Sequence, residues 1–188
     1  MGTTPTLANS PATSQALGYP GDQADSSPAV IDTVQNESAT AIDFCVPVAP
    51  GATAGTVKPI ANDADAALCS GISMRDPTMM SVDPTTNVAN YARYRELGLM
   101  KVGRIFALAA ENVQDGDQVL IITGSSAAQA QGTCFGSSHG AGGAAGSGRV
   151  AFKGAVWRAH PQGASKTIAS GTVGVIELIN QNLGVTTT

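Results

Sequence analysis

The sequence predicts an all-β protein, a small β-barrel or jelly-roll-like sandwich with an extended N-terminal arm and a long glycine-rich loop. Short apolar stretches recur along the chain, one of them with clear alternation, and Gly, Pro, Asn and Asp turns separate them at fairly regular spacing. The length of 188 residues suits one compact domain. We therefore expect a β domain over residues 29–182, preceded by the arm 1–28 and followed by a short tail, 183–188.

The arm has few sizeable apolar side chains. Residues 1–28 consist mainly of Thr, Pro, Ala, Ser, Gly and Gln, so they cannot build a core of their own. Five acidic residues and no basic residue precede Lys58. This imbalance fits either a solvated acidic arm or an arm attracted to a basic surface on a neighbouring molecule.

The clearest alternation lies in Ala41–Val48, which we expect to be a half-buried strand. The side chains expected to point inward are Ile42, Phe44, Val46 and Val48. Pro47 places this strand at a sheet edge or beside a bulge, and Pro50-Gly51 then makes a turn.

Other segments of strand character follow the same logic. The expected strands are Ala29–Val34, Thr56–Ile60, Leu68–Met74, Leu97–Ala109, Gln118–Thr123, Ala151–Ala159 and Thr172–Ile179. Asp115-Gly116 is a strong turn signal before Gln118–Thr123. Periodicity leaves Asn87–Gly98 open, since its residues fit a helical face ending at Gly98 as well as an extended strand. The tract 132–148 is rich in Gly, Ser and Ala and should be a surface loop.

Possible catalytic and ligand-binding motifs are incomplete. Gly136–Gly140 matches the spacing of a nucleophile elbow around Ser138, but no helix pattern follows it. His139 and His160 both precede Glu177, the only acid after Ser138, so the residue order of such hydrolases is not met. Cys45, Cys69 and Cys134 are too scattered for a metal site, and the first two suit small buried apolar roles. We expect no catalytic residue, no cofactor and no metal.

Composition narrows the classes of partner. Only 13% of the residues are charged, which indicates a polar uncharged surface, a surface covered by partners, or both. The net charge of −4 and pI near 4.9 argue against nucleic-acid binding. No apolar run approaches the roughly 18 residues needed to cross a bilayer, so we expect no membrane partner.

Taken in order, these segments resemble the structural cement proteins that decorate the heads of tailed bacteriophages. The residues that carry the resemblance are Gly18–Ser26, Asp43–Gly51, Cys69–Thr78, Tyr91–Ile121, Lys153–Ala159 and Gly171–Leu178. They include a Tyr-rich strand leading into Val102-Gly103-Arg104 and a strand containing Trp157. Where such proteins usually have Phe-Gly, this chain has Phe44-Cys45.

The resemblance implies a non-enzymatic protein made in the host bacterial cytoplasm and carried on the outer surface of the virion. It implies attachment at the seams between major capsid subunits, homo-oligomers (a dimer is favoured over a trimer), and an extended Asn87–Gly98. The candidate interface consists of the apolar anchors Leu17, Tyr19 and Pro20 and a basic group of Arg93, Arg95, Lys101 and Arg104, which could equally be a solvated strand face. The alternatives are a carbohydrate-binding or adhesive β module, with Trp157 as the only Trp, and a small serine hydrolase built on Ser138.

Overall fold

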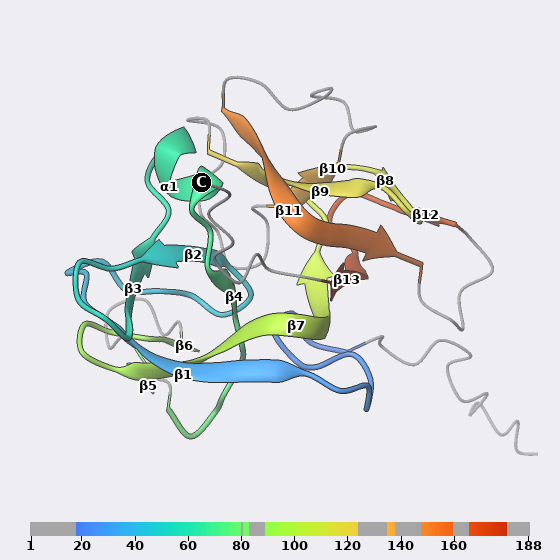
Figure 1. Cartoon of the computed structure of the whole chain (residues 1–188). Helices are drawn as coiled ribbons and strands as arrows, with labels where there is room; N and C mark the ends of the chain where they lie inside the picture. Colours follow the sequence, from blue (N-terminus) through green and yellow to red (C-terminus); the bar gives the residue numbers. More distant parts are fainter. Residues whose placement is uncertain are drawn as a thin grey trace, which may run out of the picture.

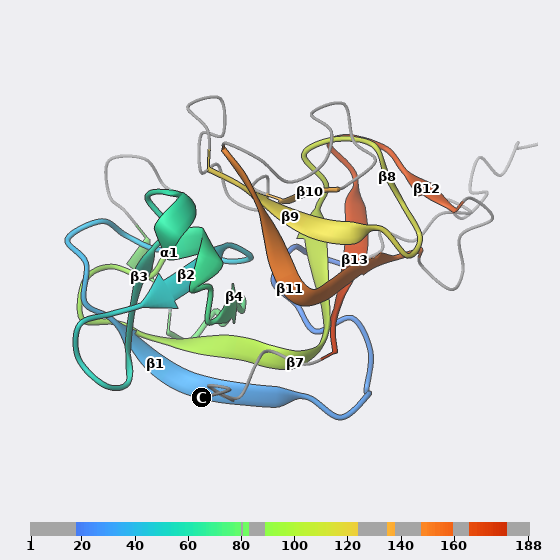
Figure 2. The same ribbon diagram turned by 45° about the horizontal axis from the view of Figure 1, so that its top comes forward.

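The computed structural model describes residues 18–79, 81–82, 89–123, 135–137, 148–159 and 166–179, and these form a closed β-barrel joined to a second curved sheet (Figures 1 and 2). The N-terminal half contributes β1 Val30–Asn36, β2 Pro47–Pro50, β3 Thr56–Pro59, helix α1 Asp63–Ala67, β4 Gly71–Ser73, β5 Ser81–Val82 and β6 Ala89–Asn90. The C-terminal half contributes β7 Glu96–Leu108, β8 Val113–Gln114, β9 Gln118–Ile122, β10 Phe135–Ser137, β11 Arg149–Arg158, β12 Thr167–Ile168 and β13 Val173–Leu178. The all-β prediction is confirmed.

The long strand β7 belongs to both parts of the fold (Figure 1). Its first half pairs with β1 and β4, and the order β1-β3-β2-β4-β7 returns to β1 and closes the barrel. Its second half pairs with β13, from which the sheet continues through β11, β9 and β10. A parallel bridge between Ala109 and Phe135 brings β10 back to the end of β7.

Gly103 lies where β7 passes from one part to the other. Its φ is +129°, and a Cβ at this position would lie 3.0 Å from Cβ of Ala29. A side chain is therefore disfavoured both by the backbone conformation and by the packing of the N-terminal segment.

One continuous core fills both parts, and Trp157, Tyr91, Phe135 and Phe152 are its largest fully buried side chains. Trp157 points inward from β11, and its indole N–H donates to the Gly136 carbonyl at 2.9 Å. Tyr91 is fully buried, and its hydroxyl donates to the Met74 carbonyl at 2.5 Å. Trp157 is therefore closed off from solvent and is not available to stack on a sugar.

The expected strand Ala41–Val48 is interrupted. Ile42 makes an isolated bridge with Tyr91, a turn follows at Phe44–Cys45, and β2 begins at Pro47. Cys45 has a φ of +58°, which ends the alternation, because a left-handed residue reorients the chain. Val46 and Val48 are buried as predicted, whereas Phe44 is only partly buried.

Other expectations differ in smaller ways. Pro47 does not mark a sheet edge, since β2 lies between β3 and β4, but as the first residue of the strand it is tolerated there. The strand expected from Leu68 begins only at Gly71, because Leu68 caps the C-terminus of α1. Within the described residues, Ala89–Gly98 is not helical, in agreement with the extended interpretation. The turn at Asp115-Gly116 is present.

Candidate interaction surface

The described part of the expected arm, residues 18–28, lies on the body of the protein. Residues 21–24 run antiparallel to β7: the Gly21 and Ala24 amides donate to the Phe106 and Arg104 carbonyls, each at 2.8 Å. The Phe106 amide donates back to the Asp22 carbonyl at 3.0 Å. On its other side, Gly21 accepts from the Arg75 amide at 2.9 Å. This segment is thus held on both sides by backbone hydrogen bonds.

The predicted anchors lie at the start of this segment. Tyr19 is 65% exposed, and the Arg75 guanidinium carbon lies 5.0 Å from the centre of its ring. Pro20 is half-buried, and Leu17 lies outside the described residues. The cation–π contact orients the Tyr19 ring and leaves most of it available to a partner.

Arg104, one of the predicted basic residues, is committed to intramolecular ion pairs. Its Nη1 lies 3.1 Å from Oδ2 of Asp25, and its Nη2 lies 2.8 Å from Oε1 of Glu177. Arg158 Nε binds the other oxygen of Glu177 at 2.6 Å. Burial alone would raise the pKa of Glu177, but hydrogen bonds from Arg158 and Arg104 outweigh it and hold that pKa below its usual value. The network joins the N-terminal segment, β7, β13 and β11.

Lys101 is also paired, with its Nζ 2.5 Å from Oδ2 of Asp32 on β1. Arg93 and Arg95 lie in the exposed turn before β7. The Arg93 guanidinium covers the Tyr94 ring at 4.7 Å and donates to the Glu37 carbonyl at 3.2 Å. At about 3.3 Å per residue, Arg95 and Arg104 lie roughly 30 Å apart along β7. The structure therefore does not gather the four basic residues into one group, and their contact with a partner remains a prediction.

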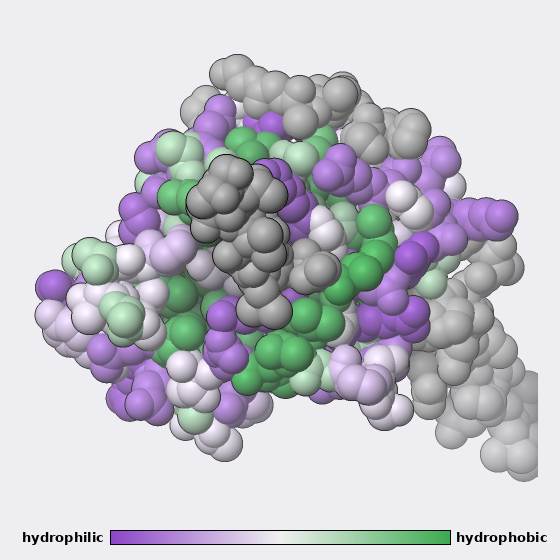
Figure 3. All heavy atoms as spheres, viewed as in Figure 1, coloured by the Kyte–Doolittle hydropathy of each residue, from purple (hydrophilic) through white to green (hydrophobic). Residues whose placement is uncertain are grey.

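Exposed apolar side chains gather where the N-terminal segment meets β1. Val30 and Ile31 are 50% and 45% exposed, and Val30 pairs with Val102 of β7. Val102 and Ile179, the latter 56% exposed, line a shallow hollow of about 200 Å³ together with Pro28. We call Val30, Ile31, Val102 and Ile179 the apolar strip. The space-filling view shows apolar groups between polar ones on the face that carries β1 and β7 (Figure 3).

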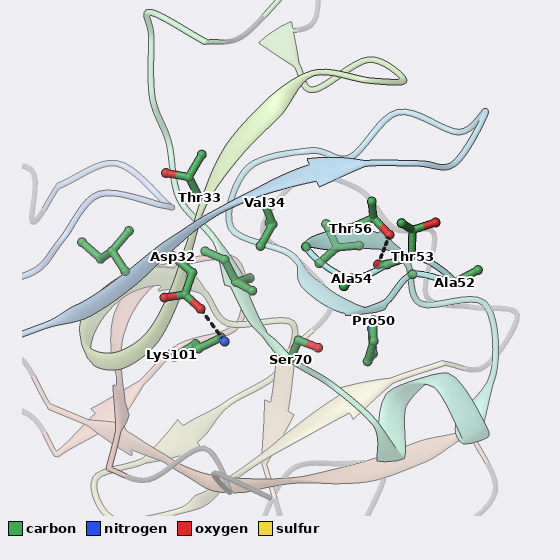
Figure 4. A pocket seen from close by; sticks show the side chains of 15 residues that line it. Asp32, Thr33, Val34, Pro50, Ala52, Thr53, Ala54, Thr56, Ser70 and Lys101 are labelled. Atoms are coloured by element: carbon green, nitrogen blue, oxygen red, sulfur yellow. Dashed lines mark hydrogen bonds and ion pairs between the residues drawn. The ribbon is translucent and has the colours of Figure 1, made fainter.

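A larger groove of about 620 Å³ opens between β1 and the loop that joins β2 to β3 (Figure 4). Its walls include Asp32, Val34, Pro50, Thr56 and Lys101. The loop is held by Glu37, whose carboxylate accepts from the Ala52 amide and the Thr56 hydroxyl, each at 2.6 Å. These hydrogen bonds fix the wall of the groove opposite β1.

The described residues bring together no constellation with obvious catalytic or metal-binding chemistry. Among them, no three His, Cys, Asp or Glu side chains could hold a metal ion, and no helix is long and apolar enough to cross a membrane. Burial raises the pKa of both the Cys45 and Cys69 thiols to about 12, which keeps them protonated. Ser138, His139, His160 and Cys134 lie outside the described residues, and Glu177 is engaged by two arginines.

Sequence reasoning missed the partners of the basic residues. Asp25, Asp32 and Glu177 are distant in sequence from the residues they bind, and alternation shows which face of a strand is buried, not which strands pair. The groove gave no sequence signal either, because it arises where β1 and β3 diverge.

Comparison with known proteins assigns the chain to a protein family. The family described as "Structural cement protein (E217 gp24/Pam3 gp6)" matches residues 9–179. The chain belongs to this family. Among solved structures it is similar to a chain from "The capsid of Myoviridae Phage XM1", with a TM-score of 0.61 and 14% identity over 93% of this chain and 98% of the other. Comparison with curated proteins gave no match.

The cement family resemblance seen in the sequence is thus confirmed, together with the β-barrel fold. The cement protein is a structural component of the virion and associates with capsid shell proteins. Its family match includes the N-terminal segment on β7 and most of the sequence preceding it.

Proposed function

We propose that this cement protein binds the outer surface of the head at the seams between major capsid subunits and that it does so without any catalytic step. The observation that carries the proposal is the apolar strip, because Val30, Ile31 and Ile179 are large and about half exposed, and Ile179 shares a hollow with Val102, the strand partner of Val30. Contiguous exposed apolar groups mark interaction surfaces. Because Lys101 and Arg104 are paired within the chain, only Arg93 and Arg95 of the candidate basic residues are exposed with no ion pair described, which favours apolar and backbone contacts as the main attachment chemistry.

Binding of this kind stabilises a shell by mass action. A protein that binds the assembled shell but not its free subunits favours assembly by about 2.7 kcal/mol per site at a concentration 100 times its Kd. Homo-oligomers, with a dimer favoured over a trimer, would add avidity of about 10² to 10⁴. A modest affinity at each contact is then sufficient for stable attachment to the shell.

The test is co-sedimentation with undecorated heads, compared with binding to free capsid subunits. We expect saturable binding to heads and at least tenfold weaker binding to free subunits, a difference of about 1.4 kcal/mol or more. Val30→Ser and Ile31→Ser together should weaken head binding, whereas Leu68→Ser, which changes an exposed leucine away from the strip, should not. Equal effects of the two changes would refute the role of the strip.

The absence of catalysis is tested separately. Ser138→Ala, His139→Ala and His160→Ala should each leave head binding and infectivity unchanged, because the sequence around them lacks a coherent catalytic arrangement. Covalent labelling of the intact protein by a serine-directed probe, abolished in Ser138→Ala, would contradict the non-enzymatic proposal.

A further inference from the structure

Among the described strands, none pairs with one backbone edge of β1 over most of its length. Along Val30–Gln35 it pairs with β7, whereas it meets β3 only at Gln35 and Asn36. The Asn36 backbone amide donates to the Arg95 carbonyl, on the side of β1 that faces β7. The Gln35 backbone amide donates to the Gly55 carbonyl, on the opposite side of β1, and both distances are 3.0 Å. Because successive strand residues alternate, Ile31 and Thr33 present their N–H and C=O groups on the same side as Gln35. No strand among the described residues pairs with them there.

This free edge borders the 620 Å³ groove, whose far wall is the loop fixed by Glu37 (Figure 4). Proteins usually protect a strand edge with Lys, Pro or a covering segment. Here the exposed residues of the edge are Val30, Ile31 and Thr33, which favour strand pairing. An open edge beside a preformed groove is the arrangement that accepts an added strand.

The lining of the groove favours an uncharged occupant. Among the described residues that line it, only Asp32 and Lys101 are charged, and they bind each other at 2.5 Å. Residues 1–17 contain no charged side chain, and Leu7 is their only large apolar residue apart from the two ends, Met1 and Leu17. Residues 1–17 therefore have uncharged side chains, as the groove favours.

The direction of the chain favours an occupant from another molecule. Residues 21–24 and then β1 both run antiparallel to β7, from its Phe106 end toward Glu96. Gly18 lies against the Phe106 ring, so residues 1–17 join the body at the end of β7 remote from the groove. From Gly18 the chain can extend at most about 36 to 40 Å before reaching Leu7. A segment continuing in this direction would lead away from the groove of its own chain, which it could enter only by reversing.

We propose that residues 1–17 of a neighbouring copy enter this groove as an added strand, pairing with the free backbone groups of Ile31 and Thr33. Leu7 packs on the apolar wall formed by Val34, Val57 and Leu99. The inference rests on the proposed homo-oligomeric cement function, in which exchange of N-terminal segments links adjacent copies on the shell.

The experiment replaces Leu7 with the photo-crosslinker benzoylphenylalanine in one ¹⁴N-labelled population and leaves a ¹⁵N-labelled population unmodified. After mixing and irradiation, mass spectrometry should find crosslinks from position 7 to residues 31–34 or 50–57 of the ¹⁵N chain. Crosslinks confined to the same chain, crosslinks to other surfaces, or no crosslinks would overturn the proposal.

A matched pair of variants of the unmodified chain tests the site. Ala54→Trp fills the groove and should reduce the crosslink yield by about tenfold or more, while Ala61→Trp, also at an exposed alanine but outside the groove, should leave it unchanged. Unchanged yield with Ala54→Trp would refute the groove as the site. Co-sedimentation of the same samples with heads separates the two proposals: head binding without groove crosslinks refutes only the exchange, and groove crosslinks without head binding refute only the cement function.

Discussion

Nη1 of Arg104 lies 3.1 Å from Oδ2 of Asp25, so the N-terminal segment is ion-paired to the strand shared by both parts of the fold. Arg104 also binds Glu177 with two nitrogens, at 3.0 and 2.8 Å, which fixes β13 beside β7. The first prediction follows from this arrangement. Arg104→Ala should lower the free energy of unfolding by about 1 kcal/mol, a modest value because the guanidinium is partly exposed.

The control for this prediction is Arg95→Ala, which removes the same charge from an exposed residue for which no ion pair is described. Its effect should stay within about 0.5 kcal/mol. Urea unfolding measures both variants, and equal effects would show that the network contributes no stability.

The second prediction concerns acid. Burial alone would raise the pKa values of Asp25 and Glu177, but hydrogen bonds from Ser27 and Arg104 to Asp25, and from Arg158 and Arg104 to Glu177, lower both below the ordinary 3.8 and 4.5. Since the folded pKa values lie below the unfolded ones, these carboxylates stabilise the fold at neutral pH. Their contribution is lost as the pH falls below about 4.5 and through the folded pKa values.

Glu177→Gln should therefore have a lower Tm than the wild type at pH 7 and a smaller loss of Tm between pH 7 and pH 3. Thermal melting across this range measures the effect. Parallel Tm curves for the two proteins would contradict the assignment.

The third prediction uses the left-handed backbone of Cys45. Cys45→Gly and Cys45→Ala both remove the sulfur, which lies 3.2 Å from the Phe106 carbonyl oxygen, but only Gly relieves a conformational cost of about 1 to 2 kcal/mol. After allowing for the greater freedom of Gly in the unfolded chain, Cys45→Gly should be the more stable by about 0.5 to 1 kcal/mol. Urea unfolding would instead rank Ala above Gly if this were an ordinary core position.

The fourth prediction concerns Trp157. Trp157→Ala should cost about 3 to 5 kcal/mol through the cavity it leaves. Trp157→Phe keeps an aromatic ring but leaves the buried Gly136 carbonyl without its indole donor, which should cost about 1 to 3 kcal/mol. An unchanged Tm in Trp157→Ala would rule out its role in the core.

The sequence predicted the long strands well because burial imposes alternation on them. β7, β11 and β13 lie within one or two residues of the segments expected from Leu97, Ala151 and Thr172. Prediction failed between Ile42 and Pro47, where one left-handed residue, Cys45, breaks an otherwise regular pattern. It also missed α1, although Asn62 followed by Asp65 is a capping signal and the Asn62 side chain does accept from the Asp65 amide at 2.9 Å.

The candidate surface was less predictable than the fold. Tyr19 is exposed as an anchor should be, but two of the four candidate basic residues, Lys101 and Arg104, are held in ion pairs with Asp25, Asp32 and Glu177. These pairs depend on strand neighbours that no local pattern specifies. Closure of the barrel likewise depends on the pairing of β1 with β7, whose paired residues lie about 65 positions apart in the sequence. No local periodicity in the sequence predicts such a long-range pairing.

The most direct test of the cement function is scanning calorimetry of undecorated heads with and without saturating protein. Binding restricted to the assembled shell should raise the temperature of shell disruption, and the rise should increase with protein concentration. The Val30→Ser, Ile31→Ser double variant should give a smaller rise at the same concentration. A shell transition that stays at the same temperature while sedimentation shows the protein bound would contradict the account.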